Sequence, residues 1–150
     1  MAAGDVTLFN EFKEDVGQKI HNLSSDSFKV GLVTNAVTPA ASTTDPRWGA
    51  GGSTNLSTNQ VTPGGNYASG GPAISATTYS ETAGVATFDG GDISIASNGS
   101  NPNNARWGII YNDTSVGKEA VAFVDLGGVT DLTAGAFSIT WSASGIFSLT

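Results

Sequence analysis

Hydrophobic residues near the start of the chain recur with the spacing of an amphipathic helix. Six of them share an arc about 120° wide on a helical wheel, the width of a stripe that covers a core. They are Leu8, Phe9, Phe12, Val16, Ile20 and Leu23. Asp5 or Thr7 could cap the helix start, Gly17 weakens its middle, and Lys19 would extend from the apolar arc to water. The pattern predicts one helix over 5–23.

From residue 27 the hydrophobic period changes to two, which is typical of a strand with one buried face. Apolar residues alternate there with Lys29 and Gly31, so 27–34 is expected to be a half-buried strand. Residues 35–72 then contain four of the five prolines, repeated Gly-Gly pairs and few large apolar side chains. This stretch is expected to be a long Gly/Pro/Thr-rich loop, functional or without fixed structure, with short extended pieces near 54–61.

Short strands separated by Gly- and Asn-containing turns return after residue 72. The candidate strands are 73–79, 83–89, 92–97, 105–112, 119–126, 135–142 and 145–149. Turns are expected at 82–84, 90–91, 98–99, 127–128 and 144–145, and 112–118 is expected to close a hairpin. Regular short strands favour an antiparallel β-sandwich or barrel, jelly-roll-like in outline, with the helix over one opening or flank. The chain, 1–150, is expected to be one domain whose main β region covers 73–150.

The composition narrows the chemistry. The chain has no cysteine, one histidine and 13% charged residues. Because most reactions at neutral pH use His, Cys, Lys or grouped carboxylates, the chain is expected to bind or assemble, not to act as an enzyme. A net charge of −7 argues against nucleic acid and anionic membranes as partners, since both would repel it. With no apolar run of about 20 residues and no secretory signal pattern, folding in a cytoplasm is expected.

Candidate reactive groups are few. His21 lies on the polar side of the predicted helix without a second His or Cys, so it is expected at the surface rather than in a zinc site or a catalytic triad. The carboxylates that could pair as in a glycosidase are expected to be turn formers. They are Asp89, Asp92, Asp113, Glu119, Asp125 and Asp131. Asp89 and Asp92, like the 98–104 loop, offer oxygen ligands for calcium, a minor alternative because neither matches an EF-hand. No metal or cofactor is expected.

The three tryptophans differ in their surroundings. Trp141 alternates with small polar residues and Trp107 lies in an apolar run, so both are expected in the core. Trp48 lies in the long polar loop, where it either folds the loop back on the chain's own β-structure or contacts another subunit. Stacking on a sugar is a third, smaller alternative. The candidate contact residues are Arg47, Trp48, Leu56 and Tyr67.

Six segments, spaced along nearly the whole chain, together resemble a group of small proteins encoded in the structural-gene clusters of tailed bacteriophages and prophages. They are FNEFKEDVG (9–17), IHNLSSDSFKVGL (20–32), YASGGP (67–72), RWGIIYNDT (106–114), VAFVDLG (121–127) and GIFSLT (145–150). The resemblance implies a capsid decoration, or cement, protein: a small β-barrel or sandwich that binds the outside of the head as a small oligomer. The 35–72 region is longer here than in leaner members of the group.

The resemblance also implies the partners. They are the major capsid protein and further copies of the chain, with a trimer as the expected oligomer. The expected location is the outer surface of the virion, after synthesis in the host cytoplasm. The alternatives are a tail, neck or fibre-associated protein, and a carbohydrate-binding adhesin that stacks sugars on Trp48 and Tyr67; a small hydrolase is disfavoured by the residue inventory. The helix face could also be the assembly surface.

Overall fold

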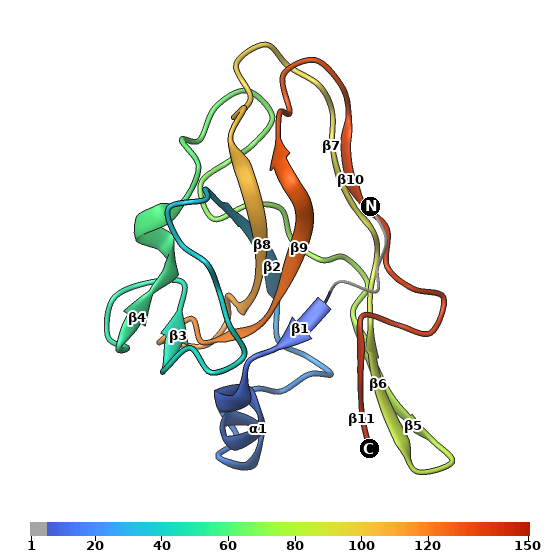
Figure 1. The fold of residues 1–150 in the computed structure, drawn as a ribbon. Helices are drawn as coiled ribbons and strands as arrows, with labels where there is room; N and C mark the ends of the chain where they lie inside the picture. The colour runs from blue at the N-terminus through green and yellow to red at the C-terminus, as the bar shows by residue number, and fades with distance from the viewer. Residues whose placement is uncertain (1–5) are drawn as a thin grey trace.

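The computed structural model describes residues 6–150, which fold as a mainly β protein with 40% strand and 8% helix. One layer is a four-stranded antiparallel sheet with the strand order β1-β9-β8-β2 (Figure 1). Its strands are β1 (Val6–Leu8), β2 (Phe28–Val33), β8 (Ala105–Asn112) and β9 (Ala120–Thr130). The second layer holds two smaller antiparallel sheets, β10-β7 and β11-β6-β5. Their strands are β5 (Thr78–Thr82), β6 (Val85–Asp89), β7 (Ile93–Ile95), β10 (Phe137–Ile139) and β11 (Phe147–Leu149). The predicted antiparallel β architecture with one helix is confirmed, as a sandwich.

A row of aromatic rings joins the two layers. Phe28 of β2 lies edge-on to Phe88 of β6, with ring centroids 5.0 Å apart. Phe88 stacks on Phe147 of β11 at 5.1 Å, and Phe147 meets Phe12 of the helix α1 (Asn10–Gly17) edge-on at 5.3 Å. Such pairs add specific geometry to the burial of large apolar surface. The row therefore fixes the helix and both layers against one core.

The predicted 5–23 helix is wrong at both ends. Residues 6–8 form β1, in which Val6 pairs with Val124 and Leu8 with Ala122 of β9. Strand pairing prevails because a β-branched residue and a large apolar residue fit a sheet edge as well as a helix, and tertiary pairing overrides weak propensity. The proposed cap Asp5 lies outside the described residues.

The helix also begins and ends differently from the prediction. The residue before it, Phe9, is extended and makes no capping hydrogen bond from its side chain, and Thr7 lies within β1. The helix ends at Gly17, and Lys19 adopts a left-handed conformation with φ 63°. An L-residue in that conformation cannot continue a right-handed helix. Residues 18–27 therefore turn away from the helix axis.

Strand β2 is buried on both faces, whereas a half-buried strand was predicted. Five of its six residues are buried. One face lies in the core between the layers, and the other is covered by the long loop, in which Trp48 lies over Gly31. Gly31 therefore reflects the space that this tryptophan needs, while the partly exposed Lys29 pairs with Asp113 at 2.9 Å.

The 35–72 segment is a folded strap along β2. It contains the short parallel strands β3 (Pro46–Arg47) and β4 (Thr54–Asn55) and the 3-10 helix η2 (Leu56–Asn59), so extended structure near 54–61 is confirmed only at its start. Backbone hydrogen bonds join the strap to β2. Val61 N donates to Leu32 O at 3.0 Å, and Val30 N donates to Pro72 O at 2.9 Å. The strap thereby satisfies backbone groups on the open edge of the main sheet.

Most of the later strands lie where the pattern predicted them. The 112–118 segment closes the β8–β9 hairpin, and Ala83 and Gly84, both at positive φ, turn β5 into β6. Two expectations are wrong. Residues 73–77 are irregular, so β5 begins only at Thr78, and 127–128 is not a turn. Strand β9 continues through it to Thr130, with Gly127 at φ 77° absorbing an irregularity in the ladder.

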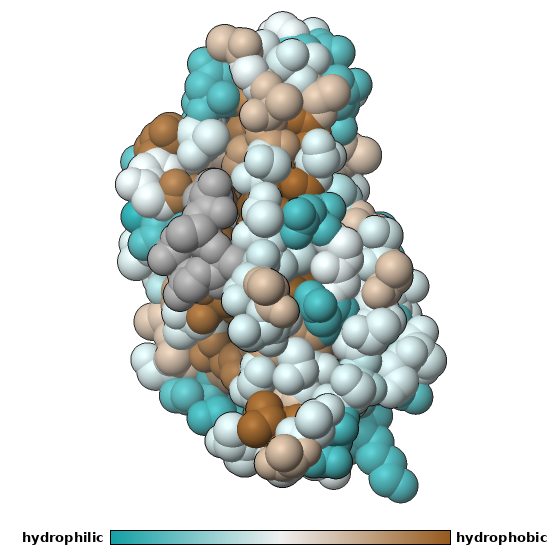
Figure 2. Space-filling model, turned by 90° about the vertical axis from the view of Figure 1, so that its right-hand side faces the viewer, coloured by the Kyte–Doolittle hydropathy of each residue, from teal (hydrophilic) through white to brown (hydrophobic). Residues whose placement is uncertain are grey.

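Over residues 6–150, no helix has the length and apolar character that crossing a bilayer requires. The face over the second layer carries mostly weakly polar side chains, with strongly hydrophilic ones scattered among them (Figure 2).

Candidate functional site

Trp48 is an internal anchor of the strap. Only 6% of the residue is exposed, and its indole stacks on the ring of Tyr111 with centroids 5.1 Å apart and planes 8° apart. Its backbone N–H donates to Lys118 O at 2.9 Å, which ties the strap to the β8–β9 loop. Of the alternatives left open by the sequence, the structure adopts the one in which Trp48 folds the loop onto its own chain.

The other three candidate contact residues also bind within the chain. Leu56 and Tyr67 are fully buried, and the Tyr67 hydroxyl accepts a hydrogen bond from Leu32 N at 2.8 Å. Arg47 is half-buried and forms ion pairs with Asp45, at 2.9 Å, and with Glu119, at 3.3 Å. These side chains hold the strap in place, and a role for them in contacts with a partner stays a prediction.

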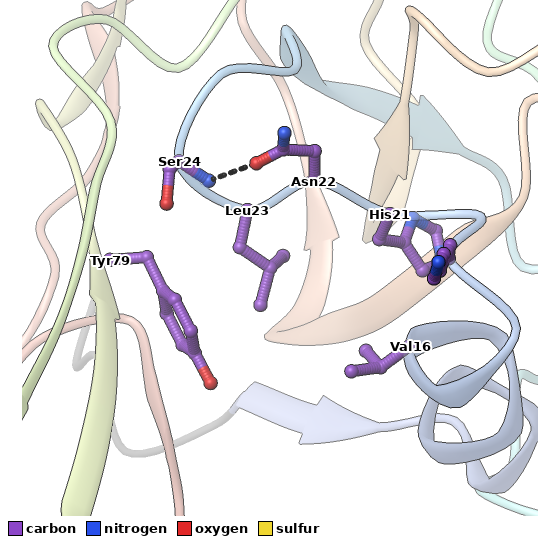
Figure 3. Close-up of a pocket in the computed structure, with 7 residues that line it drawn as sticks. Val16, His21, Asn22, Leu23, Ser24 and Tyr79 are labelled. Carbon is purple, nitrogen blue, oxygen red and sulfur yellow. Dashed lines mark hydrogen bonds between the residues drawn. The ribbon is translucent and has the colours of Figure 1, made fainter.

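Tyr67→Phe is expected to lower the free energy of unfolding by about 1–3 kcal/mol, because the buried N–H of Leu32 loses its acceptor. Chemical denaturation measures the change. Tyr79→Phe is the control, since the half-buried Tyr79 side chain lines an open hollow (Figure 3). Equal stabilities of the two variants would contradict this role for the Tyr67 hydroxyl.

The acidic positions considered for calcium bind backbone groups. Asp89 accepts from Gly90 N at 2.8 Å, and Asp92 accepts from Trp141 N at 2.9 Å. Trp141 is buried and its indole N–H donates to Gly91 O, which places it in the core as predicted. Within residues 6–150, no group of three or more His, Cys, Asp or Glu side chains is arranged to hold a metal ion.

Trp107 is only half-buried, although a core position was predicted. Its ring packs against a smaller core cluster that also contains Trp48, and lies 6.0 Å from the ring of Phe123. The guanidinium of the neighbouring Arg106 covers the ring at 3.9 Å from its centroid. The apolar run 106–111 predicted the strand correctly. The outer side of the Trp107 ring, however, is covered by the Arg106 side chain and not by other core residues.

A buried polar cluster, which the sequence pattern did not reveal, is centred on Asn112 at the end of β8. Its Oδ1 accepts hydrogen bonds from Thr114 N at 2.9 Å and Ser115 N at 3.1 Å. Its Nδ2 donates to Asp26 Oδ2 at 2.7 Å and lies 3.1 Å from His21 Nδ1. All four hydrogen-bonding positions of the amide are therefore used, and they join two chain segments that are far apart in sequence.

The placement of His21 corrects the expected surface position: only 7% of the residue is exposed. Because the chain turns after Gly17, the imidazole leaves the helix and packs beside Phe12, at 5.2 Å between centroids, and Phe28, at 6.4 Å. Its Nε2 is buried without a hydrogen bond, and the closest carboxylate oxygen is Asp15 Oδ2, at 3.7 Å.

Burial and neighbouring charges shift the acid–base behaviour of this pair. Burial, reinforced by Glu119, Glu11 and Asp45, raises the pKa of Asp15 to about 6, while Arg47 opposes the rise. Burial also lowers the pKa of His21 below its usual value, although Glu119 and Asp26 act in the opposite direction. Near neutral pH the folded protein thus holds a neutral imidazole beside a carboxylate that is ionised at a cost.

Asp15→Asn is expected to stabilise the protein at pH 7–8 and to have little stabilising effect near pH 4. The folded-state pKa of Asp15 is raised to about 6 from 3.8, so its contribution to stability is present below 3.8 and is lost as the pH rises through 6. An amide has no charge to bury at any of these pH values. Thermal melts of both proteins from pH 4 to pH 8 test this, with Glu14→Gln on the outer side of the helix as the control. A difference that grows toward acid would contradict it.

An open hollow of about 410 Å³ lies beside the polar cluster. It is lined by Val16, Lys19, His21, Asn22, Leu23, Ser24 and Tyr79. Figure 3 shows Tyr79 of β5 facing Leu23 across the hollow, with Val16 of the helix on the far side. Most of the lining residues belong to the 19–24 segment, in which His21 is in contact with Asn112.

Part of this cluster has a recognisable local signal. An asparagine that accepts from the N–H groups two and three residues ahead is typical of turns, and Asn112 begins the predicted hairpin loop. Its contacts with His21 and Asp26 bridge 91 and 86 residues and have no local signal. Comparison of the chain with protein-family models, with curated proteins and with solved structures finds no match in any of the three.

Proposed function

We propose that the chain is a structural protein of a tailed-phage particle that decorates the outside of the head and stabilises the shell. The observation that carries this proposal is the position of the six segments that resemble phage structural proteins. Between them they supply α1, β2, β8, β11, the paired part of β9 and the end of the strap. They also contact one another: Phe28 pairs with Asn112, Ile109 with Phe123, and Phe12 packs on Phe147. A resemblance that maps onto one packed unit supports a shared fold more strongly than scattered matches would.

The physical requirements of a decoration protein agree with this arrangement. Such a protein resists outward pressure by bridging neighbours through many weak contacts, which symmetry multiplies. It needs surface loops that keep their shape. In this chain the loops are tied by buried side chains: Asn112 holds the β8–β9 loop, and Asn101 donates to Ala96 O and Leu132 O, both at 2.9 Å. The net charge of −7 favours solubility at high local concentration.

The proposed partners are the major capsid protein and further copies of this chain, as a trimer. A tail, neck or fibre-associated role is the second virion role, and copy number separates it from decoration. The adhesin alternative required Trp48 and Tyr67 as stacking platforms. Both rings are packed inside the chain, so no observation favours it.

The test is the copy number of the chain in purified particles, measured by quantitative mass spectrometry against the major capsid protein. One copy per capsid subunit, or a simple symmetry-related fraction of that, is the expected result. A handful of copies per particle would overturn decoration in favour of the tail or neck, and absence would overturn any virion role. Re-addition of the purified protein to particles that lack it, followed by thermal disruption of the heads, measures the stabilisation directly.

A further inference from the structure

The hydrogen bonds of Asn112 fix the tautomer of the neutral His21 ring. The amide orientation is unambiguous, because its oxygen faces the N–H groups of Thr114 and Ser115. Its nitrogen, which can only donate, therefore faces His21 Nδ1 at 3.1 Å and Asp26 Oδ2 at 2.7 Å. Since the facing group is a donor, Nδ1 must be the acceptor, and the neutral imidazole carries its proton on Nε2.

We propose that His21 and Asn112 form an acid-sensitive latch, in which a proton added to His21 Nδ1 breaks the contact with Asn112 and frees the 19–26 segment from the β8–β9 loop. The added proton would place an N–H group directly against the amide N–H group of Asn112. Two donors cannot share a hydrogen bond, and this site has no room for water at Nε2 or Nδ1, since the side chain is fully enclosed. The ring must therefore leave its position or the amide must turn.

The charged groups around the imidazole come from several elements. Asp15 of the helix faces Nε2. Asp26, in the same 19–26 segment as His21, accepts a hydrogen bond from the Asn112 amide that also faces the imidazole. Glu119, just before β9, is close enough for its charge to act on the ring. Lys19 lies at the hollow on the same segment, and Arg47 of the strap neutralises part of the charge of Glu119.

The balance of these groups supports opening in acid. Burial outweighs the carboxylates and lowers the pKa of His21, so the folded state favours the neutral ring. The contribution of the neutral His21 ring to the stability of the fold is therefore complete above pH 6.5 and is lost progressively as the pH falls below that value. Because the pKa of Asp15 is about 6, this carboxylate takes up a proton over the same pH range. In its neutral form it cannot balance the positive charge of a protonated imidazole.

The hydrogen bonds that cross the latch define what opens. Ser27 N donates to Thr114 Oγ1, and Asp113 N donates to Ser27 O, both at 2.8 Å. Within the 19–26 segment itself, Asn22 N donates to Asp26 Oδ2, also at 2.8 Å. Release of Asn112 removes one of the contacts that hold these two segments together, and residues 19–24 of the freed segment contribute most of the lining of the hollow. In acid the lining of the hollow would lose this support.

The first experiment observes His21 directly. It is the only histidine of the chain, so its two ring nitrogens give the only imidazole signals in a nitrogen-15 NMR spectrum. The expected result at pH 7.5 is a neutral ring protonated on Nε2, which becomes charged only at a pH below the 6.5 that is usual for histidine, because burial lowers its pKa. A neutral ring protonated on Nδ1 would overturn the latch, because that form cannot accept from Asn112.

The second experiment follows amide hydrogen exchange between pH 7.5 and pH 5, corrected for the intrinsic effect of pH. Exchange at Asn22, Ser27 and Asp113 is expected to rise about tenfold or more as His21 becomes charged, while Val30 N, bonded to Pro72 O, stays protected. In His21→Gln, which cannot titrate but can accept from Asn112, the rise should vanish. The same rise in His21→Gln, or a charged His21 without any rise, would overturn the proposal. Asn101→Ala controls for general destabilisation, and the wild-type spectra remain decisive if a variant does not fold.

Discussion

Trp48→Ala is expected to lower the free energy of unfolding by about 3–5 kcal/mol, the loss typical of truncating a large buried aromatic. The indole fills the space over Gly31, stacks on Tyr111 and belongs to the cluster that includes Leu56 of the strap. Its removal leaves a cavity between the strap and the main sheet. Chemical denaturation gives the stability change. Hydrogen exchange should show the largest loss of protection at Val61 N and Thr34 N, which hold the strap to β2.

A second substitution at the same contact makes this prediction specific. A methyl group at Gly31 would overlap the indole of Trp48, and no other residue is among the three closest atoms. Gly31→Ala alone should therefore cost about 1–3 kcal/mol through overpacking. In the Trp48→Ala background the same methyl group enters the vacated space, so its cost should fall to near zero or change sign.

The control is Trp107→Ala, which removes the same side chain from a half-buried position beneath Arg106. Its cost should be clearly smaller than that of Trp48→Ala. If the two variants were equally stable, or if Gly31→Ala were equally costly with and without Trp48, the anchoring role would be refuted. The subunit-contact alternative would then regain its place, because a tryptophan that is not packed internally is available to a partner.

The strands that could be predicted are those whose partners lie nearby in sequence. Residues 105–112 are a largely apolar run that ends at a loop rich in Asn, Asp, Ser and Gly, and the next apolar run is the pairing strand. The same holds for β5 and β6 around Ala83 and Gly84. In both hairpins the turn chemistry and the apolar pattern sit within a short window, so local rules were sufficient.

The predictions are wrong where the structure or burial of a segment depends on residues far away in the sequence. Leu8 satisfied a helical wheel, but its backbone pairs with Ala122. Polar and small residues at alternate positions of β2 predict a solvent-exposed face. Gly31, however, is small because Trp48 packs directly on it. A single chain offers no signal for which far segment will cover a given face, since many segments have suitable residues.

The candidate site follows the same division. Asn112 could be predicted as the start of a turn, because its oxygen accepts from residues just ahead of it. That its nitrogen would meet His21 could not, since that pairing exists only after β8 and the 19–26 segment are side by side. Even the exposure of His21 was misjudged, because the helix ends four residues before it.

Asn112→Ala is expected to destabilise the fold by about 3 kcal/mol or more, because one truncation leaves several buried polar groups without partners. The N–H groups of Thr114 and Ser115 lose their acceptor, and Asp26 loses a donor. Chemical denaturation measures the loss, and Asn103→Ala, an exposed asparagine, is the matched control that should cost almost nothing. A small effect of Asn112→Ala would mean that water or the neighbouring backbone replaces the amide, and that the cluster is less enclosed than its burial indicates.

The conservative variant Asn112→Asp separates the two halves of the same side chain. It keeps an acceptor for Thr114 and Ser115 but replaces the donor that faces His21 and Asp26 with a carboxylate oxygen. His21 should then carry a proton on Nδ1 to donate to the new carboxylate, and its pKa should rise, because a nearby negative charge favours the imidazolium. Nitrogen-15 spectra of the single histidine read out both changes. An unchanged tautomer and pKa in this variant would show that Asn112 does not control His21, whatever the loss of stability in Asn112→Ala.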